Sequence, residues 1–182
     1  LTDNIKKGHR DTAGHFWTMI FEKKVNAIVN LSNEREINGQ IKGKCFQYWP
    51  KEKDEPIPYE VSSPNDPVKV TVVVELKSEY SIKKITIYEL EVSYQGKTRT
   101  VSLYWYTNWE DMNIPTMSDF NKYLEGINRD LERKGIKQKK FCVHCSAGVG
   151  RTGVFIACNM IKDMLKTSTV IDELQGNSTV MN

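Results

Sequence analysis

The 182-residue sequence has no long hydrophobic run, because its longest apolar blocks are only a few residues. A membrane-spanning helix needs about 20 apolar residues, so we predict no membrane segment in this chain. The sequence also lacks internal repeats and low-complexity tracts. Basic and aromatic residues are not interleaved as they are in nucleic-acid-binding surfaces, and we expect no nucleic-acid partner.

Cysteine and histidine are scarce, with four and three residues, and net charge is only +3. The cysteines do not have the spacing of a disulfide-rich secreted domain, which favours a reducing compartment. There is no secretory leader, and the first residue is Leu rather than Met. We therefore expect a fragment truncated at both ends, located in the cytoplasm or in the cytoplasmic part of a longer protein. Its length suits a single domain spanning residues 1–182.

One stretch, residues 141–153, concentrates chemically active side chains and reads FCVHCSAGVGRTG. We predict a short buried strand over residues 140–144 and a helix over residues 154–165. The loop between them would lie at a helix N-terminus, which favours anions. Gly148 and Gly150 let the backbone turn so that several N–H groups point at one centre, and Arg151 can bind two oxygens of a phosphate.

Cys145 would lie in the same electrostatic field. A thiol that faces N–H dipoles, a helix N-terminus and a guanidinium ionises well below its free pKa of about 8.5, which makes it a nucleophile at neutral pH. One loop would then hold both the nucleophile and the phosphate. The residues expected to bind the phosphate are Ser146, Ala147, Gly148, Val149, Gly150 and Arg151.

A dinucleotide site is one competing interpretation of this stretch. The glycines of residues 148–153 match G-x-G-x-x-G, with Asp172 or Glu173 about twenty residues further on. This interpretation leaves Cys145 and Arg151 without a role.

The cysteines permit a redox or a zinc interpretation as well. Cys142 and Cys145 form a C-x-x-C pair, as in thiol redox proteins, although redox chemistry does not need an anion-binding loop. With His144 they could ligate zinc, but we expect no metal, because the remaining candidates form no second cluster. Those candidates are His9, His15, Cys45 and Cys158. A purely structural role for Cys145 would explain neither the arginine nor the glycines.

Residues 144–153, HCSAGVGRTG, resemble the signature of the classical protein tyrosine phosphatases. Ten matching consecutive positions are far more specific than a C-x5-R pair. Residues 16–20, 27–31 and 44–50 fit further family motifs, so the resemblance extends from about Phe16 to Leu165. It implies a mixed, twisted α/β sheet flanked by helices, with the catalytic loop between a strand and a helix.

The resemblance also implies a reaction and its residues. Cys145 would attack the phosphorus of phosphotyrosine in proteins or peptides and form a cysteinyl-phosphate, while Arg151 holds the equatorial oxygens. Thr152 would stabilise the cysteine as it leaves as a thiolate, and His144 would orient the hydrogen bonds around it. No cofactor is implied. In the family a glutamate and a lysine support the arginine and the acid loop; here these would be Glu36 or Glu34, and Lys44.

Asp111 lies in Trp109–Pro115, where the family carries a Trp-Pro-Asp loop whose aspartate protonates the leaving oxygen and later acts as base. Without the resemblance, Asp111 would be a solvated turn carboxylate. Glu110 replaces the loop's proline, which loosens the loop and adds charge beside the acid. The family's upstream tyrosine loop and downstream glutamine loop are not matched. The alternative function is therefore a phosphotyrosine-binding or regulatory module with little turnover.

Hydrophobic periodicity predicts the other elements. Helices are expected at residues 12–24 and 118–134, with Thr12 and Ser118 as N-caps and Gly135 ending the second. Strands are expected at 25–31 and 68–76, with a surface connection over 50–67. Residues 82–94 and 98–107 should form a hairpin around Gln95-Gly96, with a bulge near Tyr88.

Two sets of apolar residues are predicted to be buried on helices. The residues of the helix at 118–134 are Phe120, Tyr123, Leu124, Ile127 and Leu131. Those of the helix after the loop are Val154, Phe155, Ala157, Cys158, Met160, Ile161, Met164 and Leu165. Trp17, Tyr48 and Trp49 are expected to be core residues, because aromatic side chains bury a large area.

Overall fold

The computed structural model describes residues 12–32, 45, 47–63, 66–82, 85–109 and 115–178. A six-stranded mixed sheet with the order β2-β3-β4-β5-β1-β6 forms its centre. The strands are β1 (Ala27–Asn30), β2 (Ile57–Ser63), β3 (Asp66–Ile82), β4 (Ile85–Tyr94), β5 (Lys97–Tyr106) and β6 (Phe141–His144). β2 to β5 form an antiparallel meander, and β1 runs parallel to both β5 and β6.

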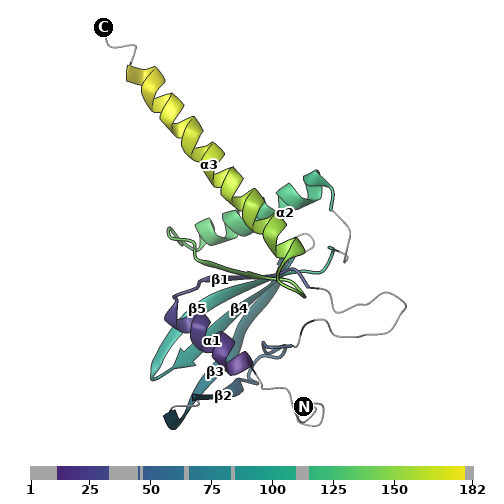
Figure 1. The fold of residues 1–182 in the computed structure, drawn as a ribbon, viewed down its shortest axis with the longest axis vertical. Coiled ribbons are helices and arrows are strands. Elements are labelled where there is room, and N and C mark those ends of the chain that lie inside the picture. Colours follow the sequence, from purple (N-terminus) through teal and green to yellow (C-terminus); the bar gives the residue numbers. More distant parts are fainter. Residues whose placement is uncertain are drawn as a thin grey trace, which may run out of the picture.

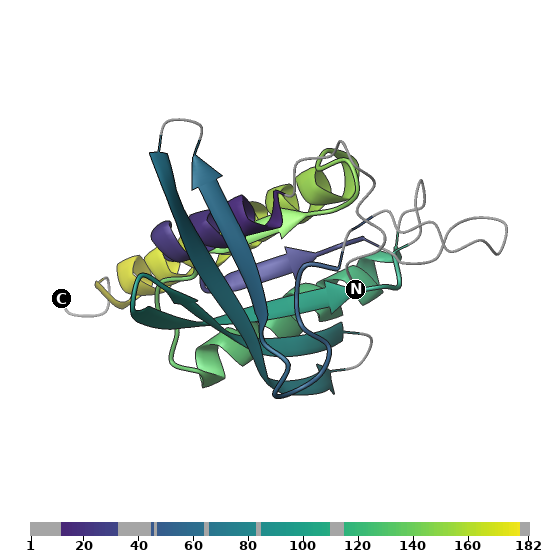
Figure 2. The same ribbon diagram turned by 90° about the horizontal axis from the view of Figure 1, so that it is seen from below.

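Three helices flank the sheet: α1 (Ala13–Glu22), α2 (Met117–Arg133) and α3 (Gly150–Ser178). Figure 1 shows α1 on one side of the sheet and α2 and α3 on the other. In Figure 2 the long strands β2 and β3 cross the direction of β5 steeply, so that the sheet is strongly twisted. The predicted mixed, twisted α/β sheet flanked by helices, with a loop between β6 and α3, is confirmed.

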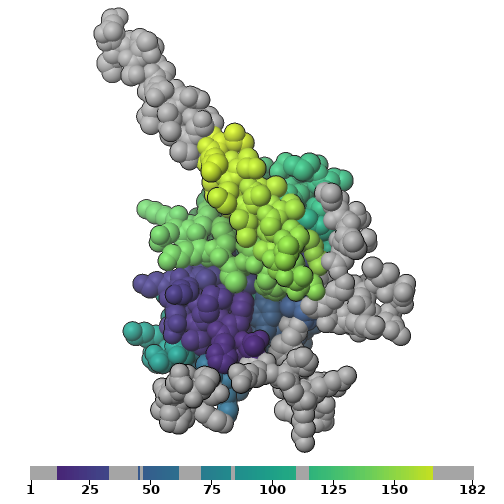
Figure 3. All heavy atoms as spheres, in the orientation of Figure 1, coloured from purple at the N-terminus to yellow at the C-terminus, as the bar shows by residue number. Residues whose placement is uncertain are grey.

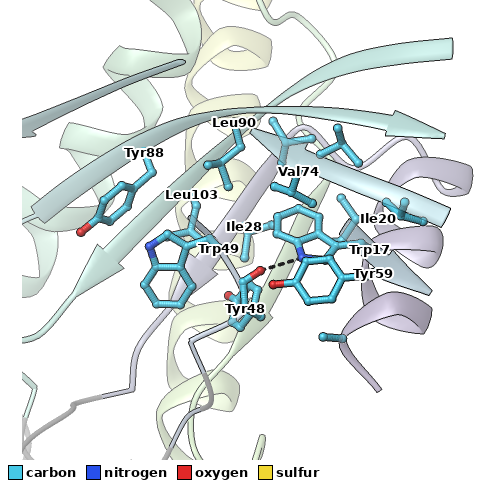
Figure 4. Packing of buried hydrophobic residues seen from close by; sticks show 14 of the residues in the cluster. Trp17, Ile20, Ile28, Tyr48, Trp49, Tyr59, Val74, Tyr88, Leu90 and Leu103 are labelled. Carbon is cyan, nitrogen blue, oxygen red and sulfur yellow. Dashed lines mark hydrogen bonds between the residues drawn. The ribbon is translucent and has the colours of Figure 1, made fainter. Parts of the chain in front are cut away.

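The face of the sheet that packs on α1 has an aromatic core (Figure 4). Trp17 is fully buried, and its indole nitrogen donates a hydrogen bond of 2.7 Å to the carbonyl oxygen of Tyr48. Trp49 and Tyr59 belong to the same cluster. Gly14 permits this packing, because a Cβ there would lie 2.9 Å from the carbonyl oxygen of Glu60 in β2. The prediction of Trp17, Tyr48 and Trp49 as core residues is confirmed.

The prediction of a surface connection over residues 50–67 is wrong, because β2 occupies part of it and pairs with β3. Prolines argue against a central strand, but β2 is an edge strand, where a missing N–H is tolerated at Pro58. β3 is also longer than the predicted 68–76. It continues to Ile82, which the apolar pattern places in the following strand.

The predicted bulge near Tyr88 is absent from the pairing of β4 with β5, because the register of these two strands is continuous. The change of apolar face near Tyr88 has another cause. Ile85 and Ile87 face the α2 and α3 side, whereas Leu90 and Val92 face the α1 side, so each helix layer covers a different half of β4. Where β4 pairs with β3, the register instead shifts in β3, between Leu76 and Ser78.

The helix boundaries differ from the predictions in their caps. Thr12 is the N-cap of α1, but its side chain makes no capping hydrogen bond. α2 is capped by Thr116 rather than Ser118, since the extended backbone of Thr116 lets its hydroxyl accept a 3.2 Å hydrogen bond from the Asp119 amide. Gly135 ends α2 with φ +72°, as predicted. All five predicted apolar residues of α2 are buried.

A buried carboxylate fastens the end of α2 to the sheet. Asp130 accepts hydrogen bonds from the hydroxyls of Tyr80 (2.9 Å) and Tyr104 (2.8 Å) and forms ion pairs with Arg133 and Lys134. Burial alone would raise the pKa of Asp130, but the hydrogen bonds from Lys134, Tyr104 and Tyr80 outweigh it and lower the pKa. The network fixes α2, which follows directly on the segment that contains Asp111.

α3 is longer and less buried than predicted. It starts at Gly150 rather than 154 and continues to Ser178. Of the eight residues predicted to be buried, only Phe155 is, at 1% exposure. Cys158 is half-buried and Ala157 exposed, and Val154, Met160, Ile161, Met164 and Leu165 are 43% to 64% exposed. The reason is that α3 follows the edge strand β6 and runs away from the sheet (Figure 1).

Among the described residues, no helix combines the length and the hydrophobicity that would let it cross a membrane.

Candidate active site

The candidate site lies where β6 gives way to α3. β6 is paired with β1, and this holds His144 at the end of a fixed strand. Cys145 follows, and the next five residues form an exposed loop that leads into the first turn of α3. Gly148 has φ +73°, a left-handed conformation that glycine adopts without strain. The loop thus places Cys145, Arg151 and Thr152 together, and each of them is buried, with an exposed fraction of 8% or less.

The thiol of Cys145 is acidified by this loop. Burial by itself would raise its pKa. The Thr152 side chain, the backbone N–H groups of Thr152 and Gly148, and the charge of Arg151 outweigh burial and lower the pKa from 9.0 to about 7. The thiolate is therefore far more accessible at neutral pH than that of an ordinary cysteine. The lowered pKa agrees with the prediction from the sequence, and among the groups that lower it the Thr152 side chain contributes most and the charge of Arg151 least.

The hydroxyl of Thr152 is buried and has no conventional hydrogen-bond partner among the described residues. A buried hydroxyl without a partner is costly, so its proton is available to the neighbouring sulfur. The same group can stabilise Cys145 whenever the sulfur carries negative charge.

Arg151 is held from the side of the Trp109 segment. Its Nη1 donates a 3.1 Å hydrogen bond to the carbonyl oxygen of Trp109. Trp109 is itself buried, and its ring meets that of Phe120 on α2 edge to face, with 5.4 Å between centroids. The start of the Trp109–Pro115 segment is therefore anchored beside the guanidinium. Asp111, Glu110, Lys44, Glu34 and Glu36 lie outside the described residues.

His144 bridges the loop and the aromatic core. Its Nδ1 lies 3.4 Å from the carbonyl oxygen of Cys145, and its Nε2 lies 2.5 Å from the hydroxyl of Tyr48. Burial lowers the pKa of His144, so the ring is neutral at pH 7. Because a carbonyl can only accept, Nδ1 carries the proton and Nε2 accepts from Tyr48. Burial also raises the pKa of Tyr48, which keeps this donor protonated.

Sequence reasoning misses the role of Tyr48, because it places this residue only in the core. Tyr48 is a core residue, at 7% exposure, and it also fixes the tautomer of His144 from 96 positions away. An aromatic pair before a proline carries no local signal for such a partner.

The dinucleotide and redox interpretations of the loop do not fit this geometry. Cys142 packs against the α1-side cluster, whereas Cys145 belongs to the cluster under α2 and α3, so the C-x-x-C residues face opposite sides of the sheet. A dinucleotide site requires its acidic residue to follow a second parallel strand. Asp172 and Glu173 lie within α3 instead. Within the described part of the chain, no three His, Cys, Asp or Glu side chains gather as metal ligands would.

Comparison with known proteins identifies similar chains. The family described as protein-tyrosine phosphatase matches residues 7–181. Receptor-type tyrosine-protein phosphatase F of Danio rerio is 30% identical over 173 residues, which is 93% of this chain and 8% of the relative. Receptor-type tyrosine-protein phosphatase S of Gallus gallus is 30% identical over 168 residues, covering 91% of this chain and 10% of the relative.

A Drosophila melanogaster protein, tyrosine-protein phosphatase Lar, is 30% identical over 169 residues, or 91% of this chain and 8% of the relative. The chain thus spans a tenth or less of the length of these curated relatives.

Proposed function

This chain belongs to the protein-tyrosine phosphatase family, and we propose that it hydrolyses phosphotyrosine in proteins through a cysteinyl-phosphate intermediate. The observation that carries the proposal is the Cys145 thiol, with a pKa of about 7, in a loop beside Arg151. We also propose that residues 1–182 act as one domain in a reducing, cytoplasmic environment, where a thiolate nucleophile survives.

In the first step, the Cys145 sulfur attacks phosphorus in line, the S–P bond forms, and the bond from phosphorus to the tyrosine oxygen breaks. The N–H groups of residues 146–150 and the guanidinium of Arg151 bind the equatorial oxygens, where charge develops. Asp111 gives its proton to the departing oxygen. This role of Asp111 rests on the family resemblance.

In the second step, water attacks the phosphorus of the intermediate while Asp111, now a carboxylate, takes a proton from the water. The S–P bond breaks, inorganic phosphate is released and Cys145 leaves as a thiolate. The Thr152 hydroxyl supports this departure, because it can donate a hydrogen bond to the sulfur. Neutral His144, held by Tyr48, keeps the backbone carbonyl of Cys145 in place.

The second candidate function is phosphotyrosine binding with little turnover. It is favoured by Glu110, which stands in place of the proline of the family's acid loop. A carboxylate next to Asp111 raises the energy of a second negative charge there and changes the pKa of the acid.

Release of phosphate from a phosphotyrosyl peptide tests the two candidates. We expect the unchanged chain to release phosphate, Cys145→Ser to release none, and Asp111→Ala to bind the peptide but turn it over at least about 100-fold more slowly. A phosphothreonyl peptide of the same sequence is the specificity control. If the unchanged chain binds the peptide tightly and releases no phosphate, the hydrolase is excluded and the binding module remains.

A further inference from the structure

A second concentration of positive charge lies at the edge of the sheet opposite the loop of Cys145. β1, β5 and β6 run in the same direction, so the loop after β6 lies at one edge and the residues that precede β1 and begin β5 lie at the other. There, the end of α1 and the β4–β5 turn lie side by side around a cavity of ≈ 580 Å³. Figure 3 shows these two segments, purple and teal, on the same side of the molecule.

The cavity is lined by three cations and one anion. Lys24 and Lys97 are exposed, Arg99 is half-buried, and Glu22 is the only acidic lining residue. The charges of Lys24, Lys97 and Arg99 less that of Glu22 leave a net charge of +2. Among the described residues, none of the three cations has an acidic partner, whereas elsewhere Lys77, Lys134 and Lys139 do. This positive charge is therefore not compensated within the described fold.

Arg99 is prepared to receive a ligand from within the cavity. Its guanidinium carbon lies 5.8 Å from the centroid of the Phe21 ring, and Phe21 packs edge to face on Tyr94. This stacking restricts the side chain. Its Nε is buried and has no hydrogen-bond partner among the described residues. An unpaired buried N–H costs free energy, so the hydrogen-bonding capacity of Arg99 is not satisfied within the described fold.

We propose that this cavity, formed by Lys24, Lys97 and Arg99, binds a phosphate monoester carried by a peptide. A phosphate monoester has a charge of about −1.5 to −2 at pH 7, which matches the net +2 of the lining. The planar fork of Arg99 suits two phosphate oxygens, and the ammonium groups supply the remaining donors. A hollow lined in part by Phe21 and Tyr94 admits a protruding side chain, whereas a flat bilayer would meet only its rim.

The cavity is separate from the proposed catalytic centre, and a phosphopeptide can bind to the cavity without any reaction at Cys145. A phosphorylated segment bound here would tether its protein to this chain while Cys145 remains open to a different residue. Linking two binding events in this way raises apparent affinity through effective concentration.

The test measures binding of a short, labelled peptide whose only charged side chain is one phosphoserine. The unphosphorylated peptide serves for comparison. All proteins carry Arg151→Lys to weaken binding at the loop of Cys145. We expect Lys24→Gln/Lys97→Gln to weaken phosphopeptide binding at least about fivefold. Lys122→Gln, which removes an exposed charge on α2, should change it by less than about twofold.

Three outcomes overturn the proposal. They are equal affinity for the phosphorylated and unphosphorylated peptides, equal affinity of the double variant and the Lys122→Gln control, and binding to vesicles that contain a phosphoinositide without binding to the peptide. Phosphotyrosine hydrolysis is measured separately on chains with Arg151 intact, so failure of this site and failure of the proposed catalysis are distinguishable.

Discussion

The two ends of the parallel strands both gather positive charge, but they hold it differently. At the end that carries Cys145, Arg151 is buried and tied to the carbonyl of Trp109, beside inward N–H groups. At the opposite end, Lys24 and Lys97 are exposed, and only Arg99 is restrained by stacking. The first arrangement suits charge that develops in a transition state, because its dipoles are already oriented. The second suits docking of an anion that does not react.

The largest difference in kcat should appear when an arginine is replaced by lysine at each end of the parallel strands in turn. Arg151→Lys keeps the charge but loses the bidentate fork and the hydrogen bond to Trp109, so we expect kcat for a phosphotyrosyl peptide to fall about 100-fold to 1000-fold. Arg99→Lys should leave kcat within about twofold. Steady-state kinetics of the two variants check this. Equal losses would mean that the ends are not functionally distinct.

An intermediate effect is expected in the pH profile. Since the thiolate is the reactive form and the pKa of Cys145 is about 7, kcat/KM should rise with pH through about 7. Thr152→Val removes the hydroxyl that lowers this pKa, which moves the rising limb to higher pH and lowers hydrolysis at about pH 6 roughly threefold to tenfold. Thr152→Ser keeps a hydroxyl and is the matched control.

Lys24→Gln/Lys97→Gln should leave the rising limb of the pH profile at the same pH, because these lysines lie at the far edge of the sheet. A limb that shifts equally in the lysine variant would show that overall charge, rather than the local hydrogen bond, sets the pKa of Cys145.

The smallest effect should be that of salt. Raising NaCl from about 0.05 M to about 0.5 M shortens the Debye length from more than about 10 Å to less than about 5 Å. Phosphopeptide affinity at the Lys24 and Lys97 cavity should fall about threefold to fivefold, because exposed charges are screened. Affinity at the buried Arg151 should change by less than about twofold. Anisotropy titrations separate the two sites when a Cys145→Ser chain that also carries Lys24→Gln/Lys97→Gln is compared with an Arg151→Lys chain. A larger salt effect at Arg151 would reverse the distinction.

The loop between β6 and α3 and the buried face of α2 could both be predicted because their determinants are local, whereas the first residue of α3 was predicted four residues too late. The roles expected of Gly148, Arg151 and Cys145 depend on a few neighbouring residues, and the apolar spacing of α2 repeats within one helix. The exposure of α3 could not be predicted in this way. Periodicity shows that Met160 and Met164 share a side of the helix, but it does not show whether anything packs against that side.

The sequence by itself determined that a thiol, a glycine-rich turn and an arginine occupy one segment, since that follows from the order of residues between 144 and 153. Only the tertiary structure brought Tyr48 to His144, the Trp109 carbonyl to Arg151, and Lys24 to Lys97 and Arg99. These contacts join segments far apart in the chain, and their formation depends on how β1, β5 and β6 align in the sheet. That alignment results from the packing of both helix layers at once, which no local pattern records.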